Sequence, residues 1–138
     1  MKEDFVSYNL AVKLKEKDYP QNICFRCYFV GDDKVRGCSV GDVIHRSYKG
    51  EKHLIAAPTI SQVLKWLREE HKLYLCPSVI TEYENDYAPH VPYWSFIVVN
   101  IETGDAIYRE YERADETRCE DFEQAALAGI EYTLDNLI

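Results

Sequence analysis

Three cysteines near the N-terminus are the residues whose types and spacing come nearest to a chemical site. Cys24 and Cys27 form a C-x-x-C pair in the stretch CFRC, and Cys38 and His45 follow them. Three thiolates and one imidazole are a tetrahedral ligand set for structural Zn²⁺. However, no second closely spaced pair follows, although strong zinc motifs contain one. If residues 23–30 form a strand, residues three apart point to opposite faces of it. The pattern therefore favours structural cysteines, with zinc ligation as one alternative and a redox pair as another.

The rest of the sequence lacks the motifs of the common enzyme classes. It contains no phosphate-binding loop, no G-x-S-x-G, no H-E-x-x-H and no EF-hand loop. Carboxylates such as Glu82, Glu84 and Asp86 are close in sequence, but no pattern places a base beside a nucleophile. We therefore expect a protein that is not an enzyme and that uses no cofactor.

Composition is that of a folded domain. The chain has 138 residues, which fits a single domain over 1–138, and 46% of them are hydrophobic. No segment is apolar enough to span a membrane, and five cysteines without an export signal favour reduced thiols and a cytoplasmic location. The net charge of −8 is divided between +3 in residues 1–72 and −11 in residues 73–138. A solvated acidic surface is the simpler interpretation, and a surface that steers a partner is the alternative.

Hydrophobic spacing predicts an α+β fold. Helices are expected at 7–17, 59–71 and 121–138, and strands at 23–30, 38–44, 73–80, 93–101 and 105–111, with an optional short strand at 54–57. The order is α-β-β-α-β-β-β-α. Because hairpins dominate it, we expect an antiparallel sheet with the helices packed on one face.

Short-range signals mark the ends of these elements. Ser7, Thr59 and Asp121 are predicted N-caps, and the last two are followed three residues later by glutamine, as in a capping box. Pro77 suits an edge strand or a bulge, and Gly104 suits a turn position with positive φ. Gly129 lies on the apolar stripe of the last helix, where it would allow close packing against the sheet.

Alternation within the strands assigns side chains to two faces. One is aliphatic and suited to burial under the helices; it holds Ile23, Phe25, Cys27, Phe29, Leu73, Leu75, Ile97, Val99, Ile101 and Ile107. The other is aromatic, and its candidate partner-binding residues are Tyr28, Tyr74, Trp94, Phe96 and Tyr108. Sheet faces open to water usually carry polar residues. The aromatic face therefore has three alternative explanations. It is covered by the chain's own loops, it binds a protein partner or a second copy of this chain, or it stacks against nucleic-acid bases.

A basic loop supports a different class of function. Residues 45–53 contain His45, Arg46, Lys49, Lys52 and His53, and such a loop could contact phosphates. The helix at 59–71 has some features of a DNA-reading helix, but the residues before it look extended, so a role as a wall of the core is favoured. Nucleic-acid binding through Arg46, Lys49 and Lys52 is thus the alternative to protein binding.

Three segments resemble a known group of proteins: MKEDFVSYNLAVKLKEK at 1–17, IAAPTISQVLKWLREEH at 55–71 and DFEQAALAGIEYTLDNLI at 121–138. They are similar to a group of small uncharacterised bacterial proteins that are often associated with phages or mobile elements. The resemblance implies a cytoplasmic accessory protein, and it brings no catalytic residue or cofactor with it. Together with the aromatic face, it leads us to expect a non-enzymatic protein that acts by binding another protein.

Overall fold

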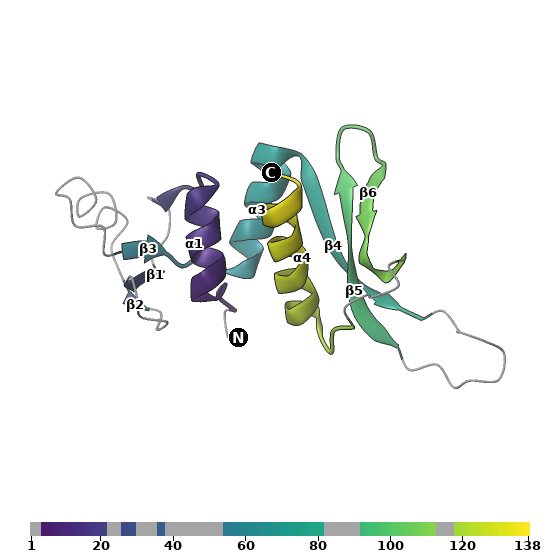
Figure 1. Cartoon of the computed structure of the whole chain (residues 1–138), viewed down its shortest axis with the longest axis horizontal. Coiled ribbons are helices and arrows are strands. Elements are labelled where there is room, and N and C mark those ends of the chain that lie inside the picture. The colour runs from purple at the N-terminus through teal and green to yellow at the C-terminus, as the bar shows by residue number, and fades with distance from the viewer. Residues whose placement is uncertain (1–3, 22–25, 30–35, 38–53, 82–91, 113–117) are drawn as a thin grey trace. The chain divides into compact units, whose positions relative to one another are not determined.

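The structure is a computed structural model (Figure 1), and it defines three α-helices and two antiparallel sheets among the residues it describes. The described residues are 4–21, 26–29, 36–37, 54–81, 92–112 and 118–138. By Cα proximity the chain forms two compact units, residues 1–63 together with Ile138 and residues 64–137. A single domain over 1–138 stays a prediction.

The first unit contains helix α1 (Tyr8–Glu16), which begins as its sequence predicts. The Ser7 side chain accepts a hydrogen bond from the backbone N–H of Leu10 at 3.3 Å, and this bond satisfies one of the N–H groups left free at a helix start. Leu10, Ala11 and Leu14 are buried along one stripe. Local capping and spacing were therefore sufficient to place this helix.

The sheet of the first unit is small. Its strands are β1 (Arg26–Phe29), β2 (Arg36–Gly37) and β3 (Leu54–Ala56), in the order β2-β1-β3. Tyr28 of β1 is buried, and its hydroxyl donates a hydrogen bond to the backbone oxygen of Val6 at 2.6 Å. Strand β3 corresponds to the optional short strand expected at 54–57.

Helix α3 (Ile60–His71) begins with the predicted capping box. The hydroxyl of Thr59 accepts from the N–H of Gln62 at 3.2 Å, and the side-chain oxygen of Gln62 accepts from the N–H of Thr59 at 2.8 Å. The chain then turns at Lys72, whose φ of 55° lies in the left-handed region, and enters the next strand.

The sheet of the second unit consists of β4 (Leu73–Ile80), β5 (Tyr93–Asn100) and β6 (Ala106–Arg109), in the order β4-β5-β6. Pro77 lies in β4, an edge strand, as its missing N–H predicts. The β5–β6 turn contains Gly104 at φ 75°, which confirms the predicted positive φ. The short 3₁₀ helix η2 (Glu110–Glu112) follows β6.

Helix α4 (Phe122–Asn136) packs on one face of this sheet (Figure 1). Asp121 caps it by accepting from the N–H of Gln124 at 2.8 Å. A Cβ atom placed on Gly129 would lie 2.5 Å from Cδ1 of Leu75 and 3.1 Å from Cγ of Phe96. Gly129 therefore packs directly against the sheet, as predicted.

The α+β class and the predicted element order are confirmed. The strands are divided between two open sheets instead of lying side by side in one. The division follows from pairing, because β1 pairs with β2 and β3, whereas β5 pairs with β4 and β6.

Candidate interaction face of the β4–β5–β6 sheet

The strand register determines which side chains share a face of the second sheet. Leu75 pairs with Val98, and Tyr74 pairs with Val99. Because side chains alternate along a strand, Leu75 and Val98 lie on one face and Tyr74 and Val99 on the other. The contact of Gly129 with Leu75 identifies the first of these as the face that α4 covers.

Aromatic rings fill the space between the sheet and α4. Tyr132 of α4 stacks on Tyr108 with ring centroids 3.7 Å apart, and Phe96 lies 5.8 Å from Tyr108 and 6.0 Å from Tyr132. Nearer the start of α4, Trp94 meets Phe122 edge to face at 5.9 Å. Aromatic side chains bury the largest areas of any residues. The helix therefore covers the face that holds Trp94, Phe96 and Tyr108 together with Leu75.

The five aromatic residues predicted for partner binding do not form one surface. Tyr28 belongs to the sheet of the first unit, where it is buried. Tyr74 lies on the face of β4 that points away from α4. Only Trp94, Phe96 and Tyr108 come together, and they do so against α4. The assignment of all five to a common face is wrong.

The error concerns the register, that is, which residues of β4 and β5 lie opposite each other. The alternation within β4 and within β5 was correct, but Leu73 and Leu75 were placed beside Ile97 and Val99, whereas Leu75 pairs with Val98. A shift of one residue exchanges every side chain between the two faces. Of the aliphatic residues predicted to be buried under the helices, Leu73 and Leu75 are buried on the face that α4 covers, whereas Ile97 and Val99 lie on the other face.

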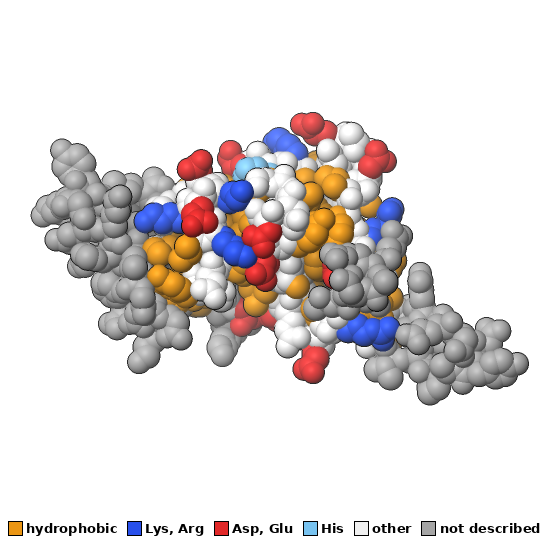
Figure 2. Space-filling view, in the orientation of Figure 1, with side chains coloured by type: hydrophobic (Ala, Val, Ile, Leu, Met, Phe, Trp, Pro, Cys, Tyr) orange, Lys and Arg blue, Asp and Glu red, His pale blue; other side chains and the backbone are white. Residues whose placement is uncertain are grey.

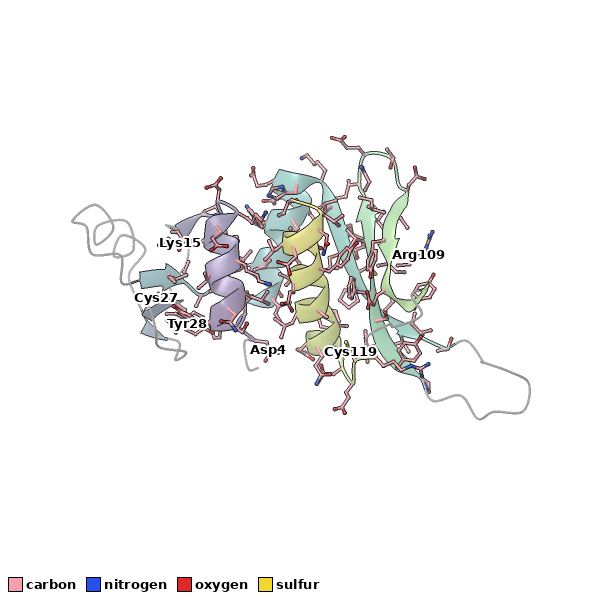
Figure 3. The ribbon with its side chains drawn as sticks, viewed as in Figure 1. Asp4, Lys15, Cys27, Tyr28, Arg109 and Cys119 are labelled. Carbon is pink, nitrogen blue, oxygen red and sulfur yellow. The ribbon has the colours of Figure 1, made fainter. Side chains whose placement is uncertain are left out.

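The other face of this sheet has no described α-helix on it, and we call it the open face. Tyr108 points to α4, so its neighbours Ile107 and Arg109 point away from that helix. The pairing shifts at Val98/Val99, where Ile107 is the extra residue of β6. Figure 3 shows Arg109 on the side of the sheet away from α4. We define the open face by Tyr74, Cys76, Ser78, Ser95, Ile97, Val99, Ile107 and Arg109. Ser95 is fully buried, so the face is covered around this residue.

The open face exposes apolar side chains. Tyr74 and Ile107 are each 45% exposed, and so is Ile101 at the start of the β5–β6 turn. The three strands contain one charged residue, Arg109, and it is exposed. Tyrosine and arginine are enriched at the centres of protein interfaces, from which lysine and carboxylates are depleted. Tyr74 and Arg109 are therefore of residue types that are common at interface centres.

A second arginine lies on the same side. Cys119 forms an antiparallel bridge with Trp94, with N–O distances of 3.0 and 2.9 Å in the two directions. Arg118, one residue earlier, is exposed and places its guanidinium 4.3 Å from the centre of the Tyr93 ring. Since Tyr93 alternates with Trp94, this cation–π pair borders the open face. Arginine at this position was missed by sequence reasoning, because the bridge at Cys119 lies outside any recognisable strand.

A small group of titratable residues lies on the covered side. The hydroxyl of Tyr108 donates to a carboxylate oxygen of Glu110, which is buried. Burial raises the pKa of the nearby Cys119 thiol, and the charges of Glu110 and Asp121 raise that pKa further. The thiol thus remains protonated at neutral pH, and a protonated thiol is a poor nucleophile and a poor metal ligand. This arrangement supports packing, and no sequence pattern indicated it.

Several predicted site residues lie outside the described part of the chain. These include Cys24 and Cys38 of the zinc hypothesis and the whole basic loop at 45–53, with Arg46, Lys49 and Lys52. Cys27 is described, and it is buried in β1. Among the described residues, no group of three or more His, Cys, Asp or Glu is placed to hold a metal ion.

Comparisons with known proteins return no relative. No family model, no curated protein and no solved structure matches the chain. Within the described residues, none of the helices has both the length and the apolar character needed to cross a membrane. The resemblance to phage-associated bacterial proteins stays a prediction.

Proposed function

We propose that the protein is an interaction module, and that its open face binds a single apolar segment of another protein. The observation that carries the proposal is the exposure of Tyr74 and Ile107 on a sheet face whose other side is already packed on α4. A sheet with one covered face usually carries polar residues on the other. In the three strands here, Arg109 is the one charged residue.

The size of the face indicates what kind of occupant it suits. Two strands of eight residues and one of four, about 4.8 Å apart, span at most roughly 14 Å by 26 Å, or about 360 Å². A standard interface between folded proteins buries about 800 Å² on each partner. A single helix is about 10 Å wide. One helix or one extended segment of a partner therefore matches the open face better than a whole second copy of this chain does.

Two residues of the same strand provide a matched test. Tyr74 and Val79 both lie in β4 and are 45% and 44% exposed, but Val79 pairs with Trp94 and lies on the opposite face from Tyr74. Tyr74→Lys and Val79→Lys thus add the same charge at equal exposure. Each protein is immobilised on resin and incubated with a cell lysate. We expect wild type and Val79→Lys to retain the same proteins from the lysate, and we expect Tyr74→Lys not to retain them.

The size of the expected loss comes from interface energetics. Truncating a tyrosine at an interface centre commonly costs about 2 kcal/mol, or roughly thirtyfold in affinity. Circular dichroism must first show that both variants remain folded. Equal retention by all three proteins would refute binding at the open face. Equal loss in both variants would show that any added charge abolishes capture, which also contradicts the proposal.

Three further expectations stay predictions. Nucleic-acid binding through Arg46, Lys49 and Lys52 concerns residues outside the described chain. A cytoplasmic location and a phage- or mobile-element-type accessory role are likewise predictions that accompany the proposal.

A further inference from the structure

The exposed part of the open face is the half next to the β5–β6 turn. In the other half Ser95 is fully buried, whereas Tyr74, Ile101 and Ile107 are all exposed. Val99 connects these exposed side chains across the sheet, because it pairs with Tyr74 of β4 and faces the register shift of β6 at Ile107. An occupant of the open face therefore meets an apolar surface centred on Val99.

An extended occupant gains no backbone hydrogen bonds on this face. The N–H and C=O groups of β5 are shared between β4 and β6. An extended segment therefore finds bonding partners only at an edge of the sheet, where it does not cover the face. On the face itself its N–H and C=O groups lie beside apolar side chains, and a buried backbone group without a partner costs free energy. An α-helix bonds these groups internally, so the face favours a helical occupant.

The spacing of the side chains on the face matches one stripe of a helix. Ile97, Val99 and Ile101 follow one another on β5 and at its end, where the ladder with the β4 side extends to Ile101. Residues two apart in a strand are about 6.6 Å apart, and residues at i, i+4 and i+8 of a helix are about 6 Å apart. The outer strands are about 9.6 Å apart, close to the helix width of about 10 Å. A helix aligned with β5 therefore contacts Tyr74 on one side and Ile107 on the other.

Charge selects among apolar helices. The exposed residues Glu102 and Asp105 lie in the β5–β6 turn, which borders the apolar surface. Acidic side chains stand out around this turn in Figure 2. Residues 64–137 contain 16 Asp and Glu against 6 Lys and Arg, a net charge of −10. The charges near the turn therefore favour lysine or arginine on the occupant.

Arg109 limits where those basic residues lie. It is opposite Ile97, whereas the β5–β6 turn begins at Ile101, four residues further along the chain. The two levels are about 13 Å apart, which exceeds the Debye length of about 8 Å at physiological ionic strength. We propose that the open face binds an amphipathic α-helix aligned with β5, with an apolar stripe at i, i+4 and i+8 and with lysine or arginine at the end beside the turn. This inference rests on the proposed function.

Three synthetic peptides test the inference, each with an acetylated N-terminus and an amidated C-terminus. In the first, KKLQALLQALLQAL, the leucines share one helix face. The second, KKLQLALQLALQLA, has the same composition with the alternation of a strand. The third, EELQALLQALLQAL, exchanges the two lysines of the first for glutamates.

Methyl NMR locates and measures the binding. Each peptide is titrated into the full chain carrying ¹³C-labelled Ile, Leu and Val methyl groups. The methyl groups of Ile97, Val99 and Ile107 report on the open face, and those of Leu75 and Val98 report on the face that α4 covers. We expect the first peptide to shift the open-face methyl groups and to bind at least about fivefold more tightly than either of the others. Glutamate at a helix N-terminus is more favourable than lysine, so weaker binding of the third peptide cannot come from a loss of helix.

One pair of variants locates the site. Tyr74→Lys should abolish the shifts caused by the first peptide, and Val79→Lys should keep them, because the two residues are equally exposed on opposite faces of β4. Binding that survives Tyr74→Lys would overturn the inference.

A second pair of variants tests the role of the turn. Glu102→Gln with Asp105→Asn should reduce the preference for lysine over glutamate to less than about twofold. Glu120→Gln with Glu123→Gln removes the same charge and should keep the preference. The control residues follow Cys119, which pairs with β5 at the end of the strand opposite the turn. An unchanged preference in the first double variant would overturn the selection of basic residues.

The outcomes separate this inference from the proposed function. Equal or tighter binding of the strand-patterned peptide would overturn the helical occupant and leave an apolar docking face. Equal or tighter binding of the glutamate peptide would overturn the selection of basic residues and leave the same docking face. Absence of open-face shifts with all three peptides up to millimolar concentration would overturn both the inference and the proposed function.

Discussion

Replacing Gly129 with alanine adds one methyl group to α4 at the point where the helix meets the sheet. The new carbon would lie 2.5 and 3.0 Å from the two Cδ atoms of Leu75 and 3.1 Å from Cγ of Phe96. Contacts this short require a neighbouring side chain to move. Leu75 and Phe96 are 4% and 2% exposed, so neither side chain has solvent to move into.

Two opposing energies set the size of the effect. Alanine is favoured over glycine in a helix interior by about 1 kcal/mol. Inserting a methyl group into a packed core costs about 1–3 kcal/mol. We therefore expect Gly129→Ala to lower the free energy of unfolding by about 1 kcal/mol.

A double-mutant cycle tests the reasoning by urea denaturation. In a Leu75→Ala background the contacts with the two Cδ atoms of Leu75 are removed and only Phe96, at 3.1 Å, stays close. Gly129→Ala should then raise the free energy of unfolding by up to about 1 kcal/mol. In a Tyr74→Ala background the effect should be the same as in wild type, because Tyr74 lies on the other face. The face assignment would be refuted if Gly129→Ala had the same effect in the Leu75→Ala background as in wild type.

Two further predictions concern single side chains. Tyr28→Phe removes the buried hydrogen bond to the backbone oxygen of Val6 and should lower the free energy of unfolding by about 1–3 kcal/mol in urea titrations; an unchanged midpoint would contradict that contribution. Because the pKa of the Cys119 thiol is raised in the folded state, the folded chain holds that proton more tightly than the unfolded chain does. Its contribution is present in full below the unfolded thiol pKa of about 8.5 and is lost as the pH rises through the folded pKa. Wild type should therefore lose stability more steeply than Cys119→Ala as the pH rises from about 8 to about 10, and parallel curves would contradict the assignment.

Helix starts were predictable because their determinants are adjacent in sequence. Ser7, Thr59 and Asp121 each accept a hydrogen bond from an N–H three residues later. A cap of this kind needs no distant residue. The packing of Gly129 was also predictable, because a glycine on the apolar stripe of a helix costs helical stability and lets the backbone approach its neighbour closely.

The candidate site was predictable only in part. The sequence indicated that the strands form a sheet with one aromatic and one aliphatic face, and Trp94, Phe96 and Tyr108 do share a face. It could not assign Tyr74 to the correct side, because that depends on the pairing of β4 with β5. Nor could it find Arg118, which reaches the open face through an isolated bridge at Cys119.

The sequence by itself determined the elements, their ends and the alternation within each strand, since these depend on neighbours a few residues apart. Only the tertiary structure decided the register between β4 and β5, the division of the strands into two sheets and the face that α4 covers. The physical reason is that a one-residue shift between strands leaves every local pattern intact and exchanges the two faces. Packing of α4 through Gly129 onto Leu75 and the aromatic rings selects one of the two arrangements. That choice leaves Tyr74, Ile107 and Arg109 on the face that α4 does not cover.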